Sequence, residues 1–403
     1  MPSIDLADAR IGVAFSGGGH RAAAFGAGVL TALLDVGLMS QVRVMTSTSG
    51  GSLVNAAVAC GRISALANGS PESDEVRRQV SGIVRMIQKT GINPYRFRIA
   101  FAIFIIAISL SIVVVVKLHR SALISCLAFI VILAAVGVSF ISANVADERI
   151  VRAVRDLFAF PKDKLPEHIP AQSRTEQVAS WEPWDMNRGH GPRYFPVEWK
   201  DLTLASLACL YDRHLFVVTD MATEDTVYAS GDGLRWFRGG YRVTSDATLA
   251  EIVTDSMRFP GYLRSRSIPG PLPGTTAQLA DGGILDNHAL SYFLLSRNRT
   301  DIDVVLSVIA ENSPRRFTAS HRITQLLAAI GLIHRHLSGL YAERILESDW
   351  SGRLIMIRLP SGLPAPTTLR RLGRDRTWAL LEAGREATFT ALGLTPDRET
   401  FEF

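Results

Sequence analysis

The sequence has little cysteine and lacks an export signal at its start. Three of its 403 residues are cysteines, and Cys60, Cys126 and Cys209 are too widely spaced to form a metal-binding pair or a disulfide framework. A reducing compartment therefore fits the chain. Residues 1–5 have neither a cationic start nor an apolar core, so no secretory signal peptide is predicted.

The sequence also lacks basic runs interleaved with aromatic residues, and a nucleic-acid partner is therefore not expected. Its net charge is nonetheless +5, and its pI is about 9.3. Such a balance fits either an ordinary arginine-rich surface or attraction to anionic membrane surfaces. Composition alone leaves these two interpretations open.

Apolar residues, in contrast, are abundant and unevenly distributed. They make up 47% of the chain, and the mean hydropathy is +0.18. Residues 99–116 and 121–146 contain no charged side chain, and four residues join them. A membrane-spanning helix needs about 20 apolar residues, so the pattern predicts a transmembrane helical hairpin over residues 99–142. A buried core hairpin and a re-entrant or interfacial hairpin are the alternatives.

The cations beside this hairpin predict its orientation. Its connecting turn holds Lys117 and Arg120, whereas its two flanks hold eight cations. Because cytoplasmic ends carry an excess of Lys and Arg, both flanks are expected in the cytoplasm. The flanking cations are Arg85, Lys89, Arg96, Arg98, Arg149, Arg152, Arg155 and Lys162.

Strands and helices are predicted to alternate on both sides of the hairpin. Residues 10–60 read as strand, glycine loop, helix, strand, sharp turn and helix, and the alternation resumes near residue 201. We therefore expect an α/β fold with a mainly parallel central sheet. Its expected parts are an N-terminal part over 8–60, connecting segments over 61–98 and 143–200, the hairpin over 99–142 and a C-terminal part over 201–403. Helices are expected over 202–211, 249–257, 319–347 and 375–392, and strands over 214–219, 303–309 and 353–359.

A glycine loop follows the first strand and opens a helix. Gly17, Gly18 and Gly19 let the backbone approach a ligand closely and point N–H groups at it. The loop loosely matches a dinucleotide-binding pattern, but the carboxylate which that fold needs after its second strand is absent. The Gly-Lys-Ser/Thr of a phosphate-binding NTPase loop is absent too. A loop that stabilises an oxyanion is therefore favoured.

A serine lies at the sharpest point of the next strand-to-helix turn. Residues 47–51 read S-T-S-G-G, a degraded form of the G-x-S-x-G elbow that exposes a nucleophilic serine above a sheet. Ser49 is therefore either a nucleophile or a helix N-cap residue. A nucleophilic serine needs a base, and none of the nine histidines lies in a triad-like signature. His288 and Asp281 are the two candidate bases, although Asp281-Gly282 also fits a simple turn.

Together these segments resemble the patatin-like phospholipase family. That family has a G-G-G-x-R/K loop, an elbow serine and a late D-G-G/A turn, which correspond here to Gly17–Arg21, Ser49 and Asp281–Gly283. Further matches are Thr219–Thr223, Asp255–Pro260 and Asn287. The departures are Ser47 at the first elbow glycine and His288 where the family usually has proline. The resemblance covers about 10–60 and 200–310.

The resemblance implies a three-layer fold and a Ser49–Asp281 dyad that cleaves acyl esters of lipids without histidine, metal or other cofactor. It implies an oxyanion hole at Gly17, Gly18 and Gly19, with supporting roles for Arg21, Gly51, Gly282 and Gly283. We therefore expect a membrane-anchored, cytoplasm-facing lipid acyl hydrolase, whose partners are membrane lipids such as phospholipids. A lipid-binding module with weak or no turnover and an acyltransferase with the same residues are the alternatives.

Overall fold

The computed structural model describes residues 8–89, 149–158, 202–210, 213–259, 263–311, 336–337, 339–348, 352–361 and 371–394, with single residues 6, 350 and 363. The predicted transmembrane hairpin, residues 99–142, lies outside these ranges. So do most of the connecting segment 143–200 and most of the helix predicted over 319–347. In the part of the chain that is described, no helix is both long and apolar enough to cross a bilayer.

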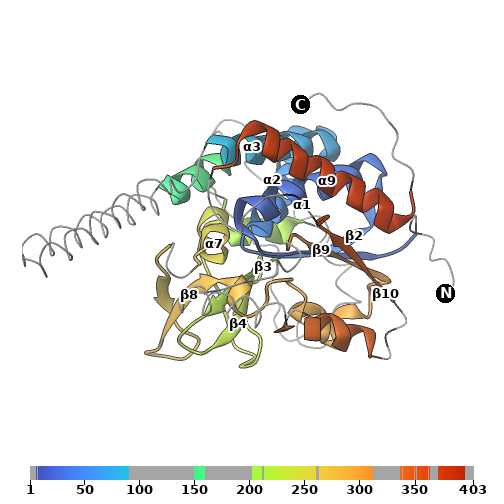
Figure 1. Cartoon of the computed structure of the whole chain (residues 1–403). Helices are drawn as coiled ribbons and strands as arrows, with labels where there is room; N and C mark the ends of the chain where they lie inside the picture. The colour runs from blue at the N-terminus through green and yellow to red at the C-terminus, as the bar shows by residue number, and fades with distance from the viewer. Residues whose placement is uncertain are drawn as a thin grey trace, which may run out of the picture.

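The described strands form a ten-stranded sheet that runs through the middle of the molecule (Figure 1). Five neighbouring strands are parallel, as predicted for the central sheet. In sheet order they are β10 (Arg353–Arg358), β9 (Val304–Ile309), β1 (Ile11–Phe15), β2 (Val42–Thr48) and β3 (Arg213–Asp220).

An antiparallel extension, which the sequence analysis did not predict, begins at β3. One branch continues the sheet through β4 (Asp225–Ser230), β5 (Gly233–Trp236) and β6 (Arg242–Val243), and the other pairs β3 with β8 (Thr276–Asp281) and β8 with β7 (Arg266–Pro269). On β3, Val217 pairs with Thr48 of β2, and the next residue, Val218, pairs with Asp281 of β8. Strand β3 therefore brings the end of β2 beside Asp281.

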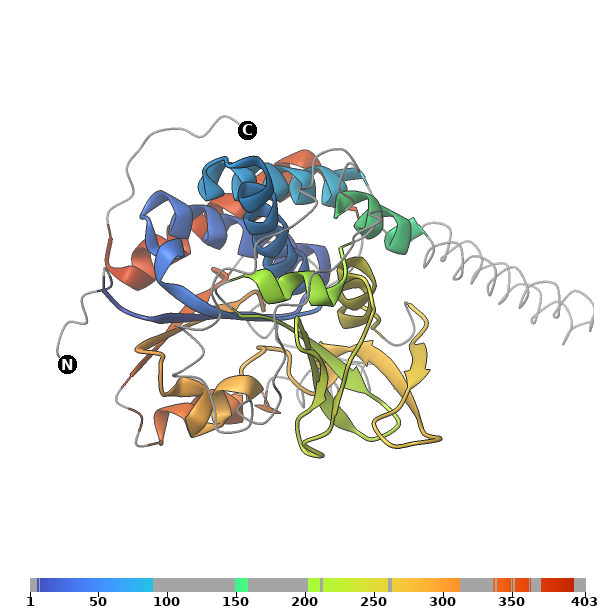
Figure 2. The same ribbon diagram turned by 180° about the vertical axis from the view of Figure 1, so that it is seen from behind.

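Helices cover one face of the sheet, and shorter elements cover the other (Figures 1 and 2). Along β1, Val13 and Phe15 belong to the core beneath the helices, whereas Ala14 belongs to a second core that includes Phe293 and Ile345. This alternation places the sheet between two apolar layers and confirms the three-layer α/β fold. The covering helices are α1 (Gly19–Asp35), α2 (Gly51–Asn68), α3 (Glu72–Lys89) and α9 (Arg374–Leu392).

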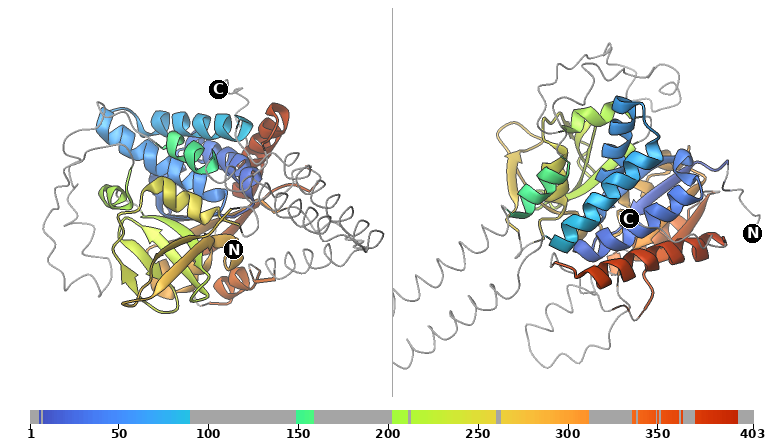
Figure 3. Two further views of the ribbon diagram at one scale, coloured as in Figure 1. Left: turned by 90° about the vertical axis from the view of Figure 1, so that its left-hand side faces the viewer. Right: turned by 90° about the horizontal axis from the view of Figure 1, so that it is seen from above.

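Helices α1 and α9 touch through two glycines. A Cβ atom at Gly28 would lie 1.8 Å from the carbonyl oxygen of Leu381, and one at Gly384 would lie 2.1 Å from that of Phe25. The two backbones are therefore in direct contact, so α9 lies across the N-terminal helix (Figure 3). The sequence predicted α9 as a helix but not its position.

Two predictions of local structure need correction. The segment over 61–98 was expected to be a connection, but residues 61–68 complete α2 and residues 72–89 form α3. The sequence shows one amphipathic patch in this segment, around Val80–Ile87, and in the structure this patch is part of the buried face of α3. The helix predicted over 202–211 is only a six-residue 3-10 helix, η3 (Leu204–Cys209). Helix α7 (Leu249–Ser256) confirms the helix predicted over 249–257 and begins with a capping box.

Candidate active site

Ser49 lies in a strained elbow between β2 and α2. Its φ is 50°, a left-handed conformation that non-glycine residues rarely adopt and that is enriched at functional sites. The elbow packs against the glycine loop so closely that a Cβ atom at Gly50 would lie 1.9 Å from the carbonyl oxygen of Gly19. A Cβ atom at Gly51 would lie 2.7 Å from that of Phe15. The small residues of this turn are therefore required by contact between two backbones.

Asp281 and Ser49 are joined by a direct hydrogen bond. The Ser49 hydroxyl donates a 2.8 Å hydrogen bond to Asp281 Oδ2, across 232 residues of sequence. The backbone N–H of Gly283 donates to the other carboxylate oxygen, also at 2.8 Å. Gly282 lets the chain turn here, because a Cβ atom at that position would lie 2.2 Å from the carbonyl oxygen of Val217. The side chain of Asp281 is thereby fixed with one oxygen toward Ser49.

Burial controls the protonation of this carboxyl group. Asp281 is 3% exposed, and desolvation raises its pKa to about 7, against the opposing effect of the hydrogen bonds from Gly283 and Ser49. A carboxyl group with such a pKa exchanges a proton readily near neutral pH, which suits a general base. Ser49 itself is also buried, with 7% of its surface exposed.

The glycine loop lies beside Ser49, and its three glycines differ in whether their backbone N–H groups are available to a ligand. The N–H of Gly17 already donates to the carbonyl oxygen of Asn287 at 2.8 Å, so it is used within the protein. Gly18 and Gly19 form the N-cap and first residue of α1, where helix geometry provides no carbonyl acceptor for the N–H group. Their φ angles of 137° and 60° are favourable only for glycine. Of the three predicted oxyanion donors, Gly18 and Gly19 are therefore the better placed.

Arg21 lies under this loop as a buried cation. A Cβ atom at Gly18 would lie 3.1 Å from Nη2 of Arg21, so the guanidinium packs against the loop backbone. Burial lowers the pKa of Arg21 to about 10, while Glu311 acts in the opposite direction. The group remains charged at neutral pH and contributes positive potential beneath the loop. This position fits a supporting role for Arg21.

Ser256, at the end of α7, holds the elbow in place and was not singled out as a site residue from the sequence. Its hydroxyl accepts the backbone N–H of Ser49 at 2.9 Å and donates to the carbonyl oxygen of Val217 at 2.6 Å. It also lies 2.9 Å from the hydroxyl of Ser52. The only sequence signal was its place in the segment Asp255–Pro260. Ser256 is therefore a positioning residue for Ser49.

The polar contact of His288 is with Glu311 and not with Ser49. Its Nε2 atom is 3.3 Å from Oε1 of Glu311, and the neighbouring Asn287 side chain donates to the same oxygen at 2.5 Å. No hydrogen bond or ion pair joins His288 to Ser49 or Asp281 among the described residues. Within those residues, no group of three or more His, Cys, Asp or Glu side chains is arranged to hold a metal ion.

Comparison with solved structures finds distant likenesses in fold. VipD from Legionella pneumophila is 13% identical, with a TM-score of 0.39 over 96% of this chain and 67% of that one. Human GIVD cytosolic phospholipase A2 is 10% identical, with a TM-score of 0.47 over 96% of this chain and 63% of that one. The type III effector protein ExoU is 12% identical, with a TM-score of 0.32 over 96% of this chain and 53% of that one. The chain thus spans less than two thirds of the length of the latter two.

Sequence comparison gives a more specific result. No curated protein matches the chain, but the sequence model of the patatin-like phospholipase family matches residues 13–103. These residues contain the glycine loop and Ser49, whereas Asp281 lies beyond them. The match confirms the resemblance of this chain to the patatin-like phospholipase family.

Proposed function

We propose that this protein is a serine lipid acyl hydrolase that cleaves acyl esters of membrane lipids, phospholipids among them. The observation that carries the proposal is the 2.8 Å hydrogen bond between Ser49 and Asp281. It joins a strained elbow serine to a buried carboxylate with a raised pKa, beside a glycine loop. Such an arrangement of nucleophile, base and N–H donors is suited to acyl transfer. That the substrates are lipids is inferred from the resemblance to the patatin-like phospholipase family.

In the proposed reaction, Asp281 accepts the hydroxyl proton of Ser49 while Oγ attacks the ester carbonyl carbon. The carbonyl oxygen becomes an oxyanion, which the N–H groups of Gly18 and Gly19 stabilise by roughly 3 kcal/mol per donor. Collapse of this intermediate breaks the ester C–O bond, and the leaving alcohol takes the proton from Asp281. Water then attacks the acyl-enzyme with Asp281 again as base, which releases the fatty acid and restores Ser49.

The nucleophile is testable by covalent labelling. A fluorophosphonate with an alkyl chain should phosphonylate Ser49 in the full-length protein, and mass spectrometry of the digested product should locate the adduct on the peptide that contains it. Ser49→Ala should abolish labelling. In parallel, phosphatidylcholine vesicles should yield free fatty acid with the wild type and none with Ser49→Ala.

Three outcomes separate the alternatives. Labelling without release of fatty acid, but with transfer of the acyl group to an added lysolipid, would assign an acyltransferase. Binding of vesicles with neither labelling nor turnover would leave a lipid-binding module. Label on another residue would remove Ser49 from the mechanism.

We further propose that residues 99–142 anchor the catalytic domain to the cytoplasmic side of a membrane. The support is the uncharged sequence of the two segments and the cations that flank them. The described elements on either side also favour an insertion. Residues 149–157 are helical, and a Cβ atom at Gly82 of α3 would lie 2.7 Å from the side chain of Leu157. The chain thus leaves α3 and returns to a helix that packs against it.

Removal of the hairpin should separate tethering from chemistry. We expect that a protein in which a short Gly/Ser linker joins residues 95 and 149 hydrolyses short-chain soluble esters within a few-fold of the wild-type rate. It should lose roughly tenfold or more of its activity on vesicles, because tethering contributes effective concentration. The measurement compares kcat/KM on the two substrates. A folded deletion variant that is inert on soluble esters would contradict a pure anchoring role.

A further inference from the structure

An arginine-rich cleft lies between the end of α7 and the β7–β8 hairpin. It has a volume of about 590 Å³ and is lined by three arginines, two serines and a glutamine: Arg258, Arg264, Arg266, Ser265, Ser267 and Gln278. No carboxylate is among these lining residues, in the part of the chain that the structure describes. Ligand cavities typically enclose about 300–1,000 Å³, so the cleft has room for more than a single ion.

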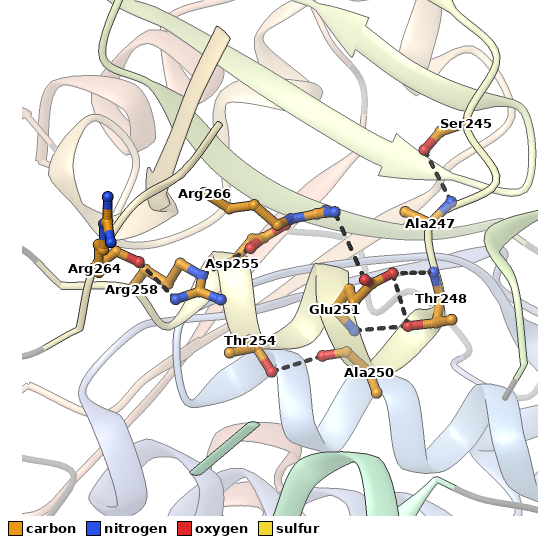
Figure 4. Close-up of polar contacts among 10 residues, drawn as sticks. All are labelled: Ser245, Ala247, Thr248, Ala250, Glu251, Thr254, Asp255, Arg258, Arg264 and Arg266. Carbon is orange, nitrogen blue, oxygen red and sulfur yellow. Dashed lines mark hydrogen bonds and ion pairs between the residues drawn. The ribbon is translucent and has the colours of Figure 1, made fainter. Parts of the chain in front are cut away.

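The acidic partners of these arginines lie behind the cleft. Asp255, which is fully buried, accepts from Nε of Arg258 at 2.9 Å and from Nε of Arg266 at 2.7 Å (Figure 4). Glu251 lies 3.9 Å from Nη1 of Arg266. Asp255 and Glu251 orient two of the three guanidinium groups, and the Asp220 carboxylate accepts the backbone N–H of Gln278 at 2.9 Å.

Arg264 contributes the third charge at the mouth of the cleft. Its backbone carbonyl accepts from Nη1 of Arg258 at 2.6 Å, which fixes the loop that carries it. Its side chain is exposed, and it forms no ion pair or side-chain hydrogen bond with any residue in the described ranges. Among the other lining residues, Nε2 of Gln278 donates to the hydroxyl oxygen of Ser267 at 3.0 Å. The hydroxyl hydrogen of Ser267 can then be donated to a ligand. The cleft therefore presents donors and positive charge to an anion.

We propose that this cleft binds a phosphate group. Guanidinium and hydroxyl donors match phosphate oxygens, and two arginines already oriented by Asp255 lose little freedom on binding. Two exposed apolar residues are neighbours of lining residues along the backbone: Phe259, 38% exposed, follows Arg258 in sequence, and Met221, 49% exposed, has its N–H bonded to the carbonyl oxygen of Gln278. Basic and apolar groups together suit a phosphate carried by a lipid.

The cleft is distinct from the Ser49 site but is attached to it. The carbonyl oxygen of Arg258 accepts the backbone N–H of Asp281 at 3.0 Å, and Arg266 pairs with Leu279 of β8. A phosphate bound in the cleft would therefore lie behind the strand that bears Asp281. This inference goes beyond the proposed hydrolysis and does not require it.

The test measures binding directly, with all proteins carrying Ser49→Ala so that no ester is cleaved. Inorganic phosphate and glycerol 3-phosphate are titrated calorimetrically into the full-length protein at low ionic strength. Vesicles of phosphatidylcholine, with and without phosphatidic acid, are then tested by co-sedimentation. Arg264→Gln and Ser267→Ala probe the cleft. Arg353→Gln on β10 is the control, because it removes one exposed arginine from the far edge of the sheet.

We expect Arg264→Gln to weaken phosphate binding roughly tenfold, because one charge-assisted contact is lost, and Ser267→Ala to weaken it less. Arg353→Gln should leave the Kd unchanged. If phosphatidic acid vesicles bind in an Arg264-dependent way, the phosphate belongs to a lipid, and if only the soluble anions do, it belongs to a free metabolite. Failure of phosphate, glycerol 3-phosphate and phosphatidic acid vesicles all to bind, or equal effects of Arg264→Gln and Arg353→Gln, would overturn the proposal. Circular dichroism of each variant confirms that it is folded.

Discussion

Asp281→Asn is expected to lower ester hydrolysis by roughly 10³-fold or more, and Ser49→Ala by at least as much. The amide of asparagine cannot accept the Ser49 proton, although it retains the shape of the carboxylate. Because the two residues act through one 2.8 Å hydrogen bond, the double variant should be no slower than the slower single variant. The measurement is kcat/KM on a fluorogenic short-chain ester, with thermal unfolding as a check of folding.

The matched control is His288→Ala. His288 contacts Glu311 and, among the described residues, forms no hydrogen bond or ion pair with Ser49 or Asp281, so its loss should change kcat/KM only a few-fold. A loss as large as that of Asp281→Asn, in a folded protein, would restore histidine as the base. Multiplicative effects of Ser49→Ala and Asp281→Asn would show that the two residues act independently, which contradicts the proposed dyad.

The rate of hydrolysis should depend strongly on pH. Burial raises the pKa of Asp281 to about 7, and only the ionised carboxylate can accept the serine proton. We therefore expect kcat/KM to level off above a pH of about 8 and to fall about tenfold per pH unit below about 6, to roughly one hundredth at pH 5. The profile is measured with a soluble ester, so that lipid ionisation does not contribute. A flat profile between pH 5 and 8 would exclude Asp281 as the base.

The same pKa predicts a change in stability with a definite sign. The folded state holds the Asp281 proton more tightly than the unfolded chain, whose pKa is near 3.8. Its contribution to stability is therefore fully present below pH 4 and is lost as the pH rises through 7. Asp281→Asn removes this loss. The free energy of unfolding of the variant, relative to that of the wild type, should therefore rise by roughly 4 kcal/mol from pH 4 to pH 8. Denaturant unfolding of the wild type and of Asp281→Asn at pH 4 and pH 8 tests this. The same stability difference between the two proteins at both pH values would contradict it.

The sequence was informative where chemistry is local. The glycine loop, the elbow around Ser49 and the Asp281 turn are short segments whose residue types follow from backbone geometry, and the structure brings all three together. The parallel strands were also readable from their apolar runs. The amphipathic patch around Val80–Ile87 was visible in the sequence, but the full extent of α3 was not predicted, because its first turns are rich in charged residues.

What the sequence could not provide depends on contacts between distant segments. Asp281 reaches Ser49 because β8 pairs antiparallel with β3, and no pattern in either strand specifies that partner. The N–H of Gly17 donates to the carbonyl oxygen of Asn287, 270 positions away, and this contact could not be predicted from the glycine loop itself. Ser256 supports the elbow from the end of α7, and its place in the segment Asp255–Pro260 did not specify that contact. Only the Gly-Asp-Gly turn at residues 231–233 hinted at the antiparallel hairpin of β4 and β5.

The direct contact between α1 and α9 affects how the protein is made. A ribosome synthesises β1 and α1 first, yet β1 lies between β2 and β9, and α1 is covered by a helix that begins at residue 374. Strand β1 thus keeps an unpaired edge until β9, about 290 residues later, has been translated, and α1 keeps an exposed apolar surface until α9, about 340 residues later, has been translated. A nascent chain that already carries Ser49 would lack both its carboxylate and its covering helix. Under the proposed function, ester cleavage would begin only after these late segments have been synthesised. A truncated product would have no lipase activity and would be bound by chaperones or degraded by proteases.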